Sequence, residues 1–431
     1  MSEPKACKTL YNQGFTTILG KLYGYEKSVI EINRNRFKKL IYEFYRNFDE
    51  EDLHFFSTPG RTELGGNHTD HNNGKVLAAS VNLDSIAVAA KNLNNKVVII
   101  SEGYSEPFCV DLNELEYQKN ERGTTTALIR GIASRFNQLG YGIGGFFACI
   151  SSNVLPGSGL SSSASIEVLI GTIFNTLYNK GQISEEIIAI IGQYSENIFF
   201  NKPCGLMDQM TCSIGGLISI DFKNPEKPVV QRLSFDFGKE KYSLLIVNTG
   251  GTHIDLTDDY SSIPKEMKSV SQLLSKDVCR DINFEQIIKN IKELRIEVGD
   301  RAILRVLHFL EENRRVEKEF AALQEGNFKY FLDMVNESGI SSCCLLQNCF
   351  TTKNVREQGL MLGLALSELY IRKIGSGACR VHGGGFAGTI QVFIPNEFVE
   401  QYVKFMGSIF GEKSVMVLNI RHYGTINLSS V

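Results

Sequence analysis

The sequence of 431 residues lacks the features that mark several large classes of protein. No run of apolar residues reaches the roughly 18 that a membrane-spanning helix needs. The opening stretch MSEPKACKTLYNQGF has no apolar core of signal-peptide length. An excess of one charge is also missing, because 45 Lys and Arg residues nearly balance 48 Asp and Glu residues. We therefore expect a cytoplasmic protein that binds small molecules and neither membranes nor nucleic acids.

The ten cysteines lack the spacing of a zinc site or of a disulfide framework. None belongs to a Cys-x-x-Cys pair, and the adjacent Cys343 and Cys344 are poorly placed to bridge each other. Reduced, buried thiols are the simpler interpretation. Only His68 and His71 have the spacing of a metal pair, and no cysteine or further histidine lies near them in sequence. A metal site built on these two histidines is a minor alternative.

Hydrophobic residues make up 43% of the chain, enough for large cores and for more than one domain. Helical spacing of apolar residues predicts helices at 26–47, with Ile32 on its apolar stripe, and at 184–200, 264–296, 302–325 and 355–373. Runs rich in β-branched residues predict strands at 76–92, 95–103, 216–222, 242–250, 388–395 and 414–420. The stretch 144–159, GGFFACISSNVLPGSG, predicts a further strand that leads directly into a glycine-containing loop. The polar segment 223–232 is interpreted as a crossing between domains. This mixture favours the α+β class.

Residues 155–165, LPGSGLSSSAS, place glycines and serines directly before an apolar-periodic run. Pro156 and the glycines predict a loop at 155–160 and a helix that begins among the serines. The free N–H groups at a helix start bind phosphate well, and glycines let the phosphate approach the backbone. Serines also cap helices that bind nothing, and Leu160 stands where a P-loop has lysine. The pattern alone leaves a phosphate cradle and a simple cap both open.

Three further segments carry groups suited to chemistry. Residues 58–74, TPGRTELGGNHTDHNNG, crowd hydrogen-bonding side chains into a turn-rich stretch, which suits a polyhydroxylated ligand or a solvated loop. Residues 195–210, SENIFFNKPCGLMDQM, hold Glu196 and Asp208, which taken alone favour a surface carboxylate pair. Residues 381–395, VHGGGFAGTIQVFIP, have three glycines before a strand, typical of a tight turn or of a close approach to a ligand.

Together and in this order, these segments resemble the galactokinase branch of the GHMP small-molecule kinase superfamily. PGRTELGGNHTDHNNG is similar to the galactokinase signature, and LPGSGLSSSAS is similar to the phosphate loop. PCGLMDQ is similar to the segment with the catalytic aspartate, and GGGFAGT to the C-terminal glycine motif. The resemblance implies an α+β fold with two domains, residues 1–225 and 226–431, and an active site in the cleft between them. It implies an enzyme that uses ATP and Mg²⁺ to convert galactose to galactose 1-phosphate.

The resemblance also implies a role for individual residues. Asp208 would be the catalytic aspartate, acting as a base or as an orienting group, with Arg61 beside it to keep the carboxylate ionised. Ser163 and Glu196 match the magnesium ligands. The implied sugar contacts are Asn67, His68, Asp70, Gly205 and Tyr260. The implied phosphate loop consists of Gly157, Ser158, Gly159, Leu160, Ser161, Ser162 and Ser163, in which Ser161 and Ser162 would bind phosphate and cap the helix.

Departures from the family pattern leave alternatives open. Asn67 stands where galactokinases usually carry a glutamate that contacts the C6 end of the sugar, and His71 replaces a common tyrosine. An amide there would tolerate a carboxylate at C6, which makes a galacturonate 1-kinase one alternative. An N-acetylgalactosamine kinase is another, because one sequence does not place the residues around the C2 substituent. Residues 338–348, SGISSCCLLQN, also differ from the family pattern. A non-catalytic sugar and ATP sensor is the rival from another class, but the complete GLSSSAS loop favours an enzyme. The sequence leaves the oligomeric state open and is compatible with a monomer.

Overall fold

The computed structural model describes residues 5–154, 159–251 and 256–430, which contain two β-sheets. The larger sheet runs in the order β12-β1-β2-β5-β3-β4, and β6 and β7 continue it from the first half of β2. Its strands are β1 (His54–Gly65), β2 (Lys75–Lys91), β3 (Lys96–Ser101), β4 (Phe108–Asp111), β5 (Phe146–Ser152), β6 (Leu217–Asp221), β7 (Val229–Leu233) and β12 (Ile426–Asn427).

The smaller sheet is antiparallel throughout and runs in the order β11-β8-β10-β9. Its strands are β8 (Tyr242–Asn248), β9 (Ala378–Val381), β10 (Thr389–Pro395) and β11 (Val415–Leu418). The helices that accompany the two sheets are α1 (Gln13–Tyr23), α2 (Lys27–Asn47), α3 (Thr125–Gln138), α4 (Ser162–Asn179), α5 (Glu185–Tyr194), α6 (Met207–Ile214), α7 (Thr257–Leu273), α8 (Phe284–Glu297), α9 (Asp300–Gln324), α10 (Phe328–Ser341), α11 (Gly359–Ile374) and α12 (Val399–Phe410).

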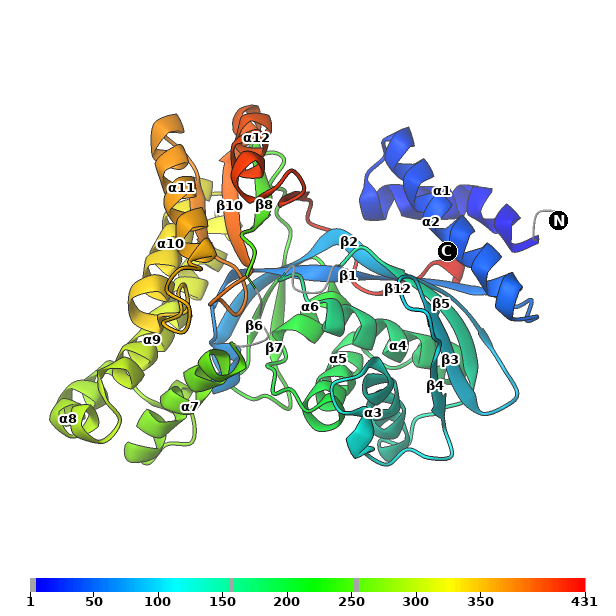
Figure 1. Cartoon of the computed structure of the whole chain (residues 1–431), viewed down its shortest axis with the longest axis horizontal. Helices are drawn as coiled ribbons and strands as arrows, with labels where there is room; N and C mark the ends of the chain where they lie inside the picture. Colours follow the sequence, from blue (N-terminus) through cyan, green and yellow to red (C-terminus); the bar gives the residue numbers. More distant parts are fainter. Residues whose placement is uncertain (1–4, 155–158, 252–255, 431) are drawn as a thin grey trace.

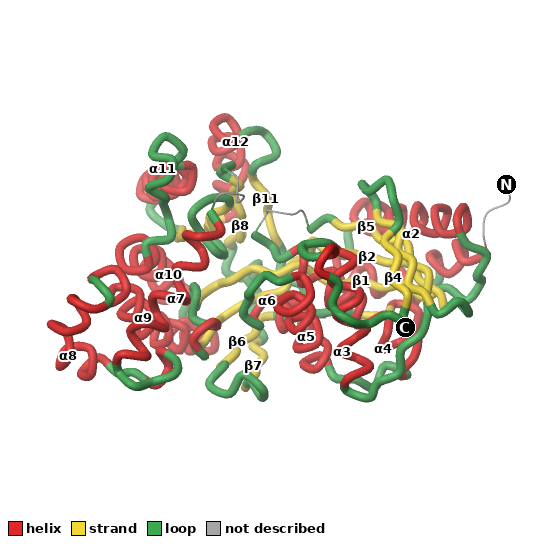
Figure 2. The backbone as a smooth tube through the Cα atoms, turned by 60° about the horizontal axis from the view of Figure 1, so that its bottom comes forward, coloured by secondary structure: helices red, strands yellow, loops and turns green. Residues whose placement is uncertain are grey.

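Helices cover both faces of the larger sheet. Successive side chains of a strand point to opposite faces, and β2 shows this clearly. Ala87 and Ala89 pack with α3 and α4, whereas Ile86 and Val88 pack with α1 and α2. Figures 1 and 2 show α1 and α2 on one side of the strands and α3 to α6 on the other. Burial on both faces explains why β2 is apolar along most of its length.

The two sheets share one apolar core where the β1–β2 hairpin meets the second half of the chain. Leu64 and Leu77 of the hairpin pack with Leu244 of β8, Phe393 of β10 and Val316 of α9. The division at residue 225 stays a prediction. Two strands beyond it, β7 and β12, pair with β6 and β1 of the larger sheet.

Most of the expected elements are confirmed, including the helix at 26–47, which forms α2. Three details differ. Ile32 is 63% exposed, because the buried stripe of α2 follows Phe37, Leu40 and Phe44 instead. The expected helix at 264–296 is two helices, because a capping box at Asn283 starts α8 afresh. The expected crossing at 223–232 includes the start of β7, which pairs with β6.

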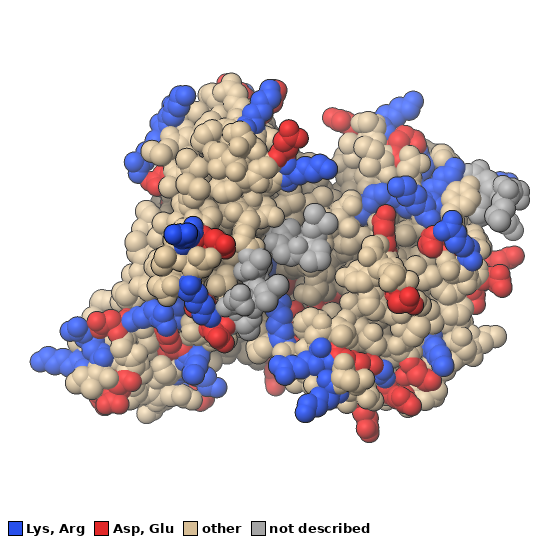
Figure 3. Space-filling view, in the orientation of Figure 1, with Lys and Arg blue, Asp and Glu red and all other residues tan. Residues whose placement is uncertain are grey.

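The α10 helix was not expected from the sequence, and it packs beside α9 and β9. Within the described ranges, no helix is both long and apolar enough to cross a membrane. On the face shown in Figure 3, basic and acidic side chains are interspersed, and neither sign gathers into one large patch.

Candidate active site

One cavity brings together both predicted catalytic residues, one predicted magnesium ligand and four of the five predicted sugar contacts. It lies where the β1–β2 hairpin, the start of α6, α7 and the β9–β10 turn meet. Of the predicted site residues, those that line it are Arg61, His68, Asp70, Glu196, Gly205, Asp208 and Tyr260. Because these residues come from segments far apart in the chain, their convergence supports a functional site over a chance cluster of polar loops.

Arg61 and Asp208 form a bidentate ion pair at this cavity. Arg61 Nε donates to Asp208 Oδ1 at 2.6 Å, and Nη2 donates to Oδ2 at 2.8 Å. Asp208 stands in the first turn of α6, where the helix dipole favours negative charge. Burial alone would raise the pKa of Asp208, but the charge and hydrogen bonds of Arg61 outweigh it and lower the pKa below its usual value. Asp208 is therefore ionised.

The residues just before α4, in the predicted phosphate loop, are hydrogen-bonded to Arg61 and Asp208. The Ser161 hydroxyl donates a hydrogen bond to Asp208 Oδ2, and Arg61 Nη1 donates one to the Gly159 carbonyl. The backbone N–H of Arg61 donates to the Leu160 carbonyl at 3.1 Å. Gly159 has φ +72°, and a β-carbon there would come within 2.4 Å of Thr389 Oγ1 on β10. This position therefore requires glycine.

The helix itself begins at Ser162, as the serine-rich stretch predicts. The expectation that Ser161 caps it is wrong, because Ser161 makes no capping hydrogen bond and directs its hydroxyl to Asp208. The Leu160 side chain is completely buried in the core, so only its backbone is left for a phosphate. Gly157 and Ser158 lie outside the described residues.

Ser163 and Glu196 meet as the resemblance implies. Ser163 Oγ donates to Glu196 Oε1 at 3.1 Å, and Lys202 Nζ lies 3.2 Å from the same oxygen. Gln209 Nε2 donates at 2.9 Å to both Glu196 Oε2 and Glu167 Oε2. Burial, and then the nearby Glu196 carboxylate, raise the pKa of Glu167 well above its usual value. One hydroxyl and one carboxylate supply oxygen ligands of the kind that Mg²⁺ prefers.

No group of three or more His, Cys, Asp and Glu side chains suited to a metal ion occurs in the described part of the chain. The alternative of a metal held by His68 and His71 therefore has no third ligand there. The His68 ring makes a different contact, in which Nε2 donates to the Gly384 carbonyl at 2.9 Å. Burial lowers the pKa of His68 to about 3, so the ring is neutral and carries its proton on Nε2.

The remaining predicted sugar contacts line the same cavity as Asp70. Asp70 Oδ1 accepts a hydrogen bond from the backbone N–H of His71 at 3.0 Å. Gly205 packs directly against this carboxylate, and the Tyr260 ring lies 5.2 Å from that of His68. A carboxylate beside aromatic rings and an open backbone can bind the hydroxyls and the apolar face of a sugar.

Asn67 does not belong to this surface, which corrects the expected sugar contact. Its side chain is completely buried and does not line the cavity. Asn67 Nδ2 donates to Glu63 Oε1 at 3.0 Å and to the Gly383 carbonyl at 2.8 Å. Its Oδ1 accepts from Ser342 Oγ at 3.2 Å and from Asn348 Nδ2 at 2.9 Å. All four positions are used, so the argument for galacturonate from this amide loses its structural basis.

Sequence reasoning missed two charged residues of the cavity, Glu63 and Lys202. The signal for Glu63 was present, because it follows Arg61 by two residues in a strand and must share its face. Lys202 gave no such signal, since its approach to Glu196 depends on the π-helical turn at Ser195–Phe200.

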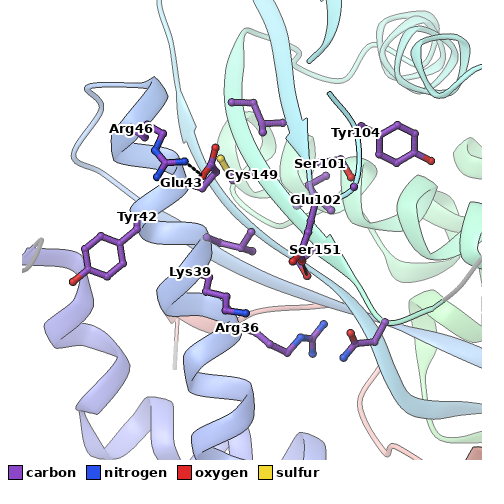
Figure 4. A pocket seen from close by; sticks show the side chains of 15 residues that line it. Arg36, Lys39, Tyr42, Glu43, Arg46, Ser101, Glu102, Tyr104, Cys149 and Ser151 are labelled. Carbon is purple, nitrogen blue, oxygen red and sulfur yellow. Dashed lines mark hydrogen bonds and ion pairs between the residues drawn. The ribbon is translucent and has the colours of Figure 1, made fainter. Parts of the chain in front are cut away.

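A second and larger cavity, of about 650 Å³, lies between α2 and the ends of β3 and β5 (Figure 4). Several of its charged side chains already have partners. Arg46 bonds to Glu43, Arg36 to Asp84, and Ser151 donates to Glu102. None of the predicted site residues lines it, and it offers no cluster of groups suited to catalysis.

Comparisons with known proteins agree with this site. Residues 127–216 match the GHMP kinases N terminal domain, and residues 42–91 match the galactokinase galactose-binding signature. A galactokinase of Clostridium tetani is 28% identical over 380 residues, which cover 86% of this chain and 91% of that protein. A galactokinase of Clostridium acetobutylicum is 28% identical over 395 residues, which cover 89% and 94%.

Solved structures share the fold. The galactokinase of Lactococcus lactis complexed with galactose superposes with a TM-score of 0.77 at 23% identity, over 89% of this chain and 98% of that chain. The mevalonate kinase of Methanococcus jannaschii gives a TM-score of 0.59 at 17% identity, over 85% and 98%. The expected α+β fold is thereby confirmed.

Proposed function

Because the chain is a GHMP kinase that carries the galactokinase sugar-binding signature, we propose that it transfers the γ-phosphoryl group of ATP to the C1 hydroxyl of galactose. The observation that carries this proposal is the Arg61–Asp208 pair. It stands between the start of the phosphate-loop helix and the polar pocket around Asp70. A phosphate donor and a sugar acceptor would meet at this pair.

Asp208 would bind the attacking hydroxyl. Oδ2 already accepts two hydrogen bonds, from Arg61 and Ser161, whereas Oδ1 accepts one, so Oδ1 keeps a lone pair for the sugar. An ionised carboxylate can orient this hydroxyl and take its proton as the new O–P bond forms. Arg61 holds the carboxylate ionised and offsets negative charge on the transferring phosphoryl group. Orientation matters most, because a loose transition state requires little help from a base.

Ser163 and Glu196 would hold Mg²⁺, because Ser163 Oγ and Glu196 Oε1 already lie 3.1 Å apart. When bound, the ion supplies positive charge to the phosphates. The start of α4 offers backbone N–H groups for the same phosphates. Lys202, beside Glu196, adds a cation at this end of the cavity.

For the sugar, Asp70 supplies an acceptor able to serve two hydroxyls, and Tyr260 and His68 supply ring surface beside it. Gly205 leaves the approach to Asp70 open. These contacts support galactose over mevalonate, which has no ring to fill such a pocket.

The test is ADP release by the purified protein with magnesium-ATP and galactose, galacturonate, N-acetylgalactosamine, glucose or mevalonate. We expect galactose to give the highest kcat/KM. A higher kcat/KM for another acceptor would overturn the assigned substrate. Heat released on sugar binding, without turnover of any acceptor, would overturn the enzyme and favour a sensor.

A further inference from the structure

The sugar cavity holds a carboxylate that none of the roles above uses. Glu63 lines this cavity, and its side chain is nearly all buried, with only 4% exposed. Arg380 Nη2 and Asn67 Nδ2 both donate to Oε1, the second at 3.0 Å. Within the described residues, no hydrogen bond reaches Oε2. One oxygen of a buried carboxylate is therefore available to a ligand.

The surrounding packing holds Glu63 in place. Its partner Arg380 is completely buried and also donates to the Leu64 carbonyl at 2.8 Å. Asn67 joins Glu63 to the β9–β10 turn through the Gly383 carbonyl at 2.8 Å. Contacts from β1, from the hairpin turn and from β9 thus fix the carboxylate before any sugar arrives. Preorganised groups of this kind discriminate between ligands at a small entropic cost.

The position of Glu63 indicates which end of the sugar it meets. Arg61 and Glu63 pair with Ser80 and Ala78 of β2, so they are two residues apart on one strand and face the same side. Two residues of a strand span about 7 Å, which is comparable with the width of a pyranose ring. Arg61 marks the transfer end because it holds Asp208. Glu63 then stands near the opposite end of a hexose whose C1 hydroxyl lies at Asp208.

We propose that Glu63 is a specificity-determining residue, whose Oε2 accepts a hydrogen bond from the C6 hydroxyl of the sugar while Asn67 and Arg380 position it. The inference rests on the proposed function and assigns to Glu63 the carboxylate that the family pattern places at position 67. Two consequences follow. A sugar without the C6 hydroxyl leaves a buried carboxylate oxygen unpaired, which costs affinity. A sugar with a carboxylate at C6 sets a second carboxylate beside Glu63, whose pKa burial already raises to about 7, so one of the two groups must bind a proton at a cost in affinity.

The test compares kcat/KM for galactose and for 6-deoxygalactose in the wild-type protein and in Glu63→Gln. Hydrogen bonds to charged groups contribute enough for the wild type to prefer galactose by about 10- to 100-fold. In Glu63→Gln, kcat/KM for galactose falls by a similar factor, mainly through KM, whereas the value for 6-deoxygalactose changes by less than about threefold. Equal losses for both sugars would overturn the assignment, since Glu63 would then act on the fold alone.

Two further variants distinguish the loss of the C6 contact from a general disturbance of the fold. Glu63→Asp keeps the charge beside Arg380 but withdraws the oxygens by one methylene, and we expect the same selective loss for galactose. Ser367→Ala is the control, because it removes a buried hydroxyl that bonds to Tyr402 Oη at 2.6 Å, away from the cavity and from the contacts of Glu63, and it should leave the sugar preference unchanged.

If the Glu63 variants do not fold, the sugar preference of the wild type alone tests the role of Glu63. Equal kcat/KM for galactose and 6-deoxygalactose, or a preference for galacturonate, would overturn the role of Glu63 while galactose turnover still supported the kinase. No turnover of galactose would instead contradict the proposed function itself.

Discussion

Gly205 lies so close to Asp70 that a β-carbon at position 205 would come within 1.7 Å of Asp70 Oδ2. The backbone of Gly205 does not have positive φ, so alanine would not strain the main chain there. Its effect would be confined to the contact with Asp70. Because Gly205 has no side chain, it leaves the Asp70 carboxylate uncovered at this side of the cavity.

We expect Gly205→Ala to raise KM for galactose and to leave KM for ATP unchanged. Overpacking costs about 1–3 kcal/mol, which corresponds to roughly 5- to 150-fold in KM. Steady-state kinetics with either substrate varied would measure the split. The matched control is Gly407→Ala in α12, where the new β-carbon would meet nothing nearer than 3.6 Å. A rise in KM for ATP as large as that for galactose would contradict the assigned role.

Asp208→Asn tests the residue at the centre of the site. The amide keeps the shape of the side chain but can neither take a proton nor carry the charge that pairs with Arg61. We expect kcat to fall by about 100-fold or more, the range typical for the loss of a group that transfers a proton. Galactose should still bind, as measured by titration calorimetry. Turnover within a few-fold of the wild type would refute the assignment of Asp208.

The ion pair with Arg61 predicts a pH dependence. Asp208 must be ionised to act, and its pKa is lowered because Arg61 outweighs the effect of burial. At saturating galactose, the contribution of Asp208 to kcat is therefore lost only when the pH falls through this low value. In Arg61→Gln the same carboxyl is buried without its cation, and an opposite charge at this distance typically lowers a carboxyl pKa by about 1–3 units.

We therefore expect the acid limb of the kcat profile to move upward by about 1–3 pH units in Arg61→Gln, in addition to a general loss of rate. Profiles of the wild type and the variant over the acidic range would measure the shift. Circular dichroism at each pH would show that both proteins stay folded. An unmoved acid limb would mean that Asp208 does not set it.

The sequence predicted the order of the site segments and the start of the phosphate-loop helix, because both depend on local patterns. A run of glycine, proline and serine before an apolar-periodic stretch signals a loop and a helix start, and the side chains of β2 alternate between two faces because it is a strand. The sequence could not place Asn67. Whether that side chain faces a sugar or the interior depends on Ser342 and Asn348, which lie far away in the chain.

Charged residues show the same limit. The Lys202–Glu196 pair depends on a π-helical turn, which no pattern of apolar residues announces. Serine is a common N-cap residue, and Ser161 stands at the N-cap position. Its hydroxyl nevertheless bonds to Asp208, because the backbone there is left-handed, with φ +61°. In both cases the tertiary contact, and not the residue type, decides the role.

The contact between Ser163 and Glu196 leads to the last prediction. If these two oxygens hold Mg²⁺, then Ser163→Ala and Glu196→Gln each remove one of the few protein ligands of an ion that relies otherwise on phosphate and water. We expect the Mg²⁺ concentration for half-maximal activity at saturating ATP to rise by about tenfold or more in each variant, in the range reported for disturbed metal sites. Titration of Mn²⁺ by electron spin resonance in the presence of ADP gives a second readout that does not depend on turnover.

Conservative and neighbouring changes separate ion binding from a loss of packing. Ser163→Thr keeps the hydroxyl, so its Mg²⁺ requirement should stay close to that of the wild type. Lys202→Met removes the cation beside Glu196 but no ligand, and should weaken nucleotide binding without a tenfold rise in the Mg²⁺ requirement. If Ser163→Ala and Ser163→Thr raised the Mg²⁺ requirement equally, the cause would be altered helix packing and not the loss of the hydroxyl. An unchanged requirement in both Ser163→Ala and Glu196→Gln would remove this pair from the metal site.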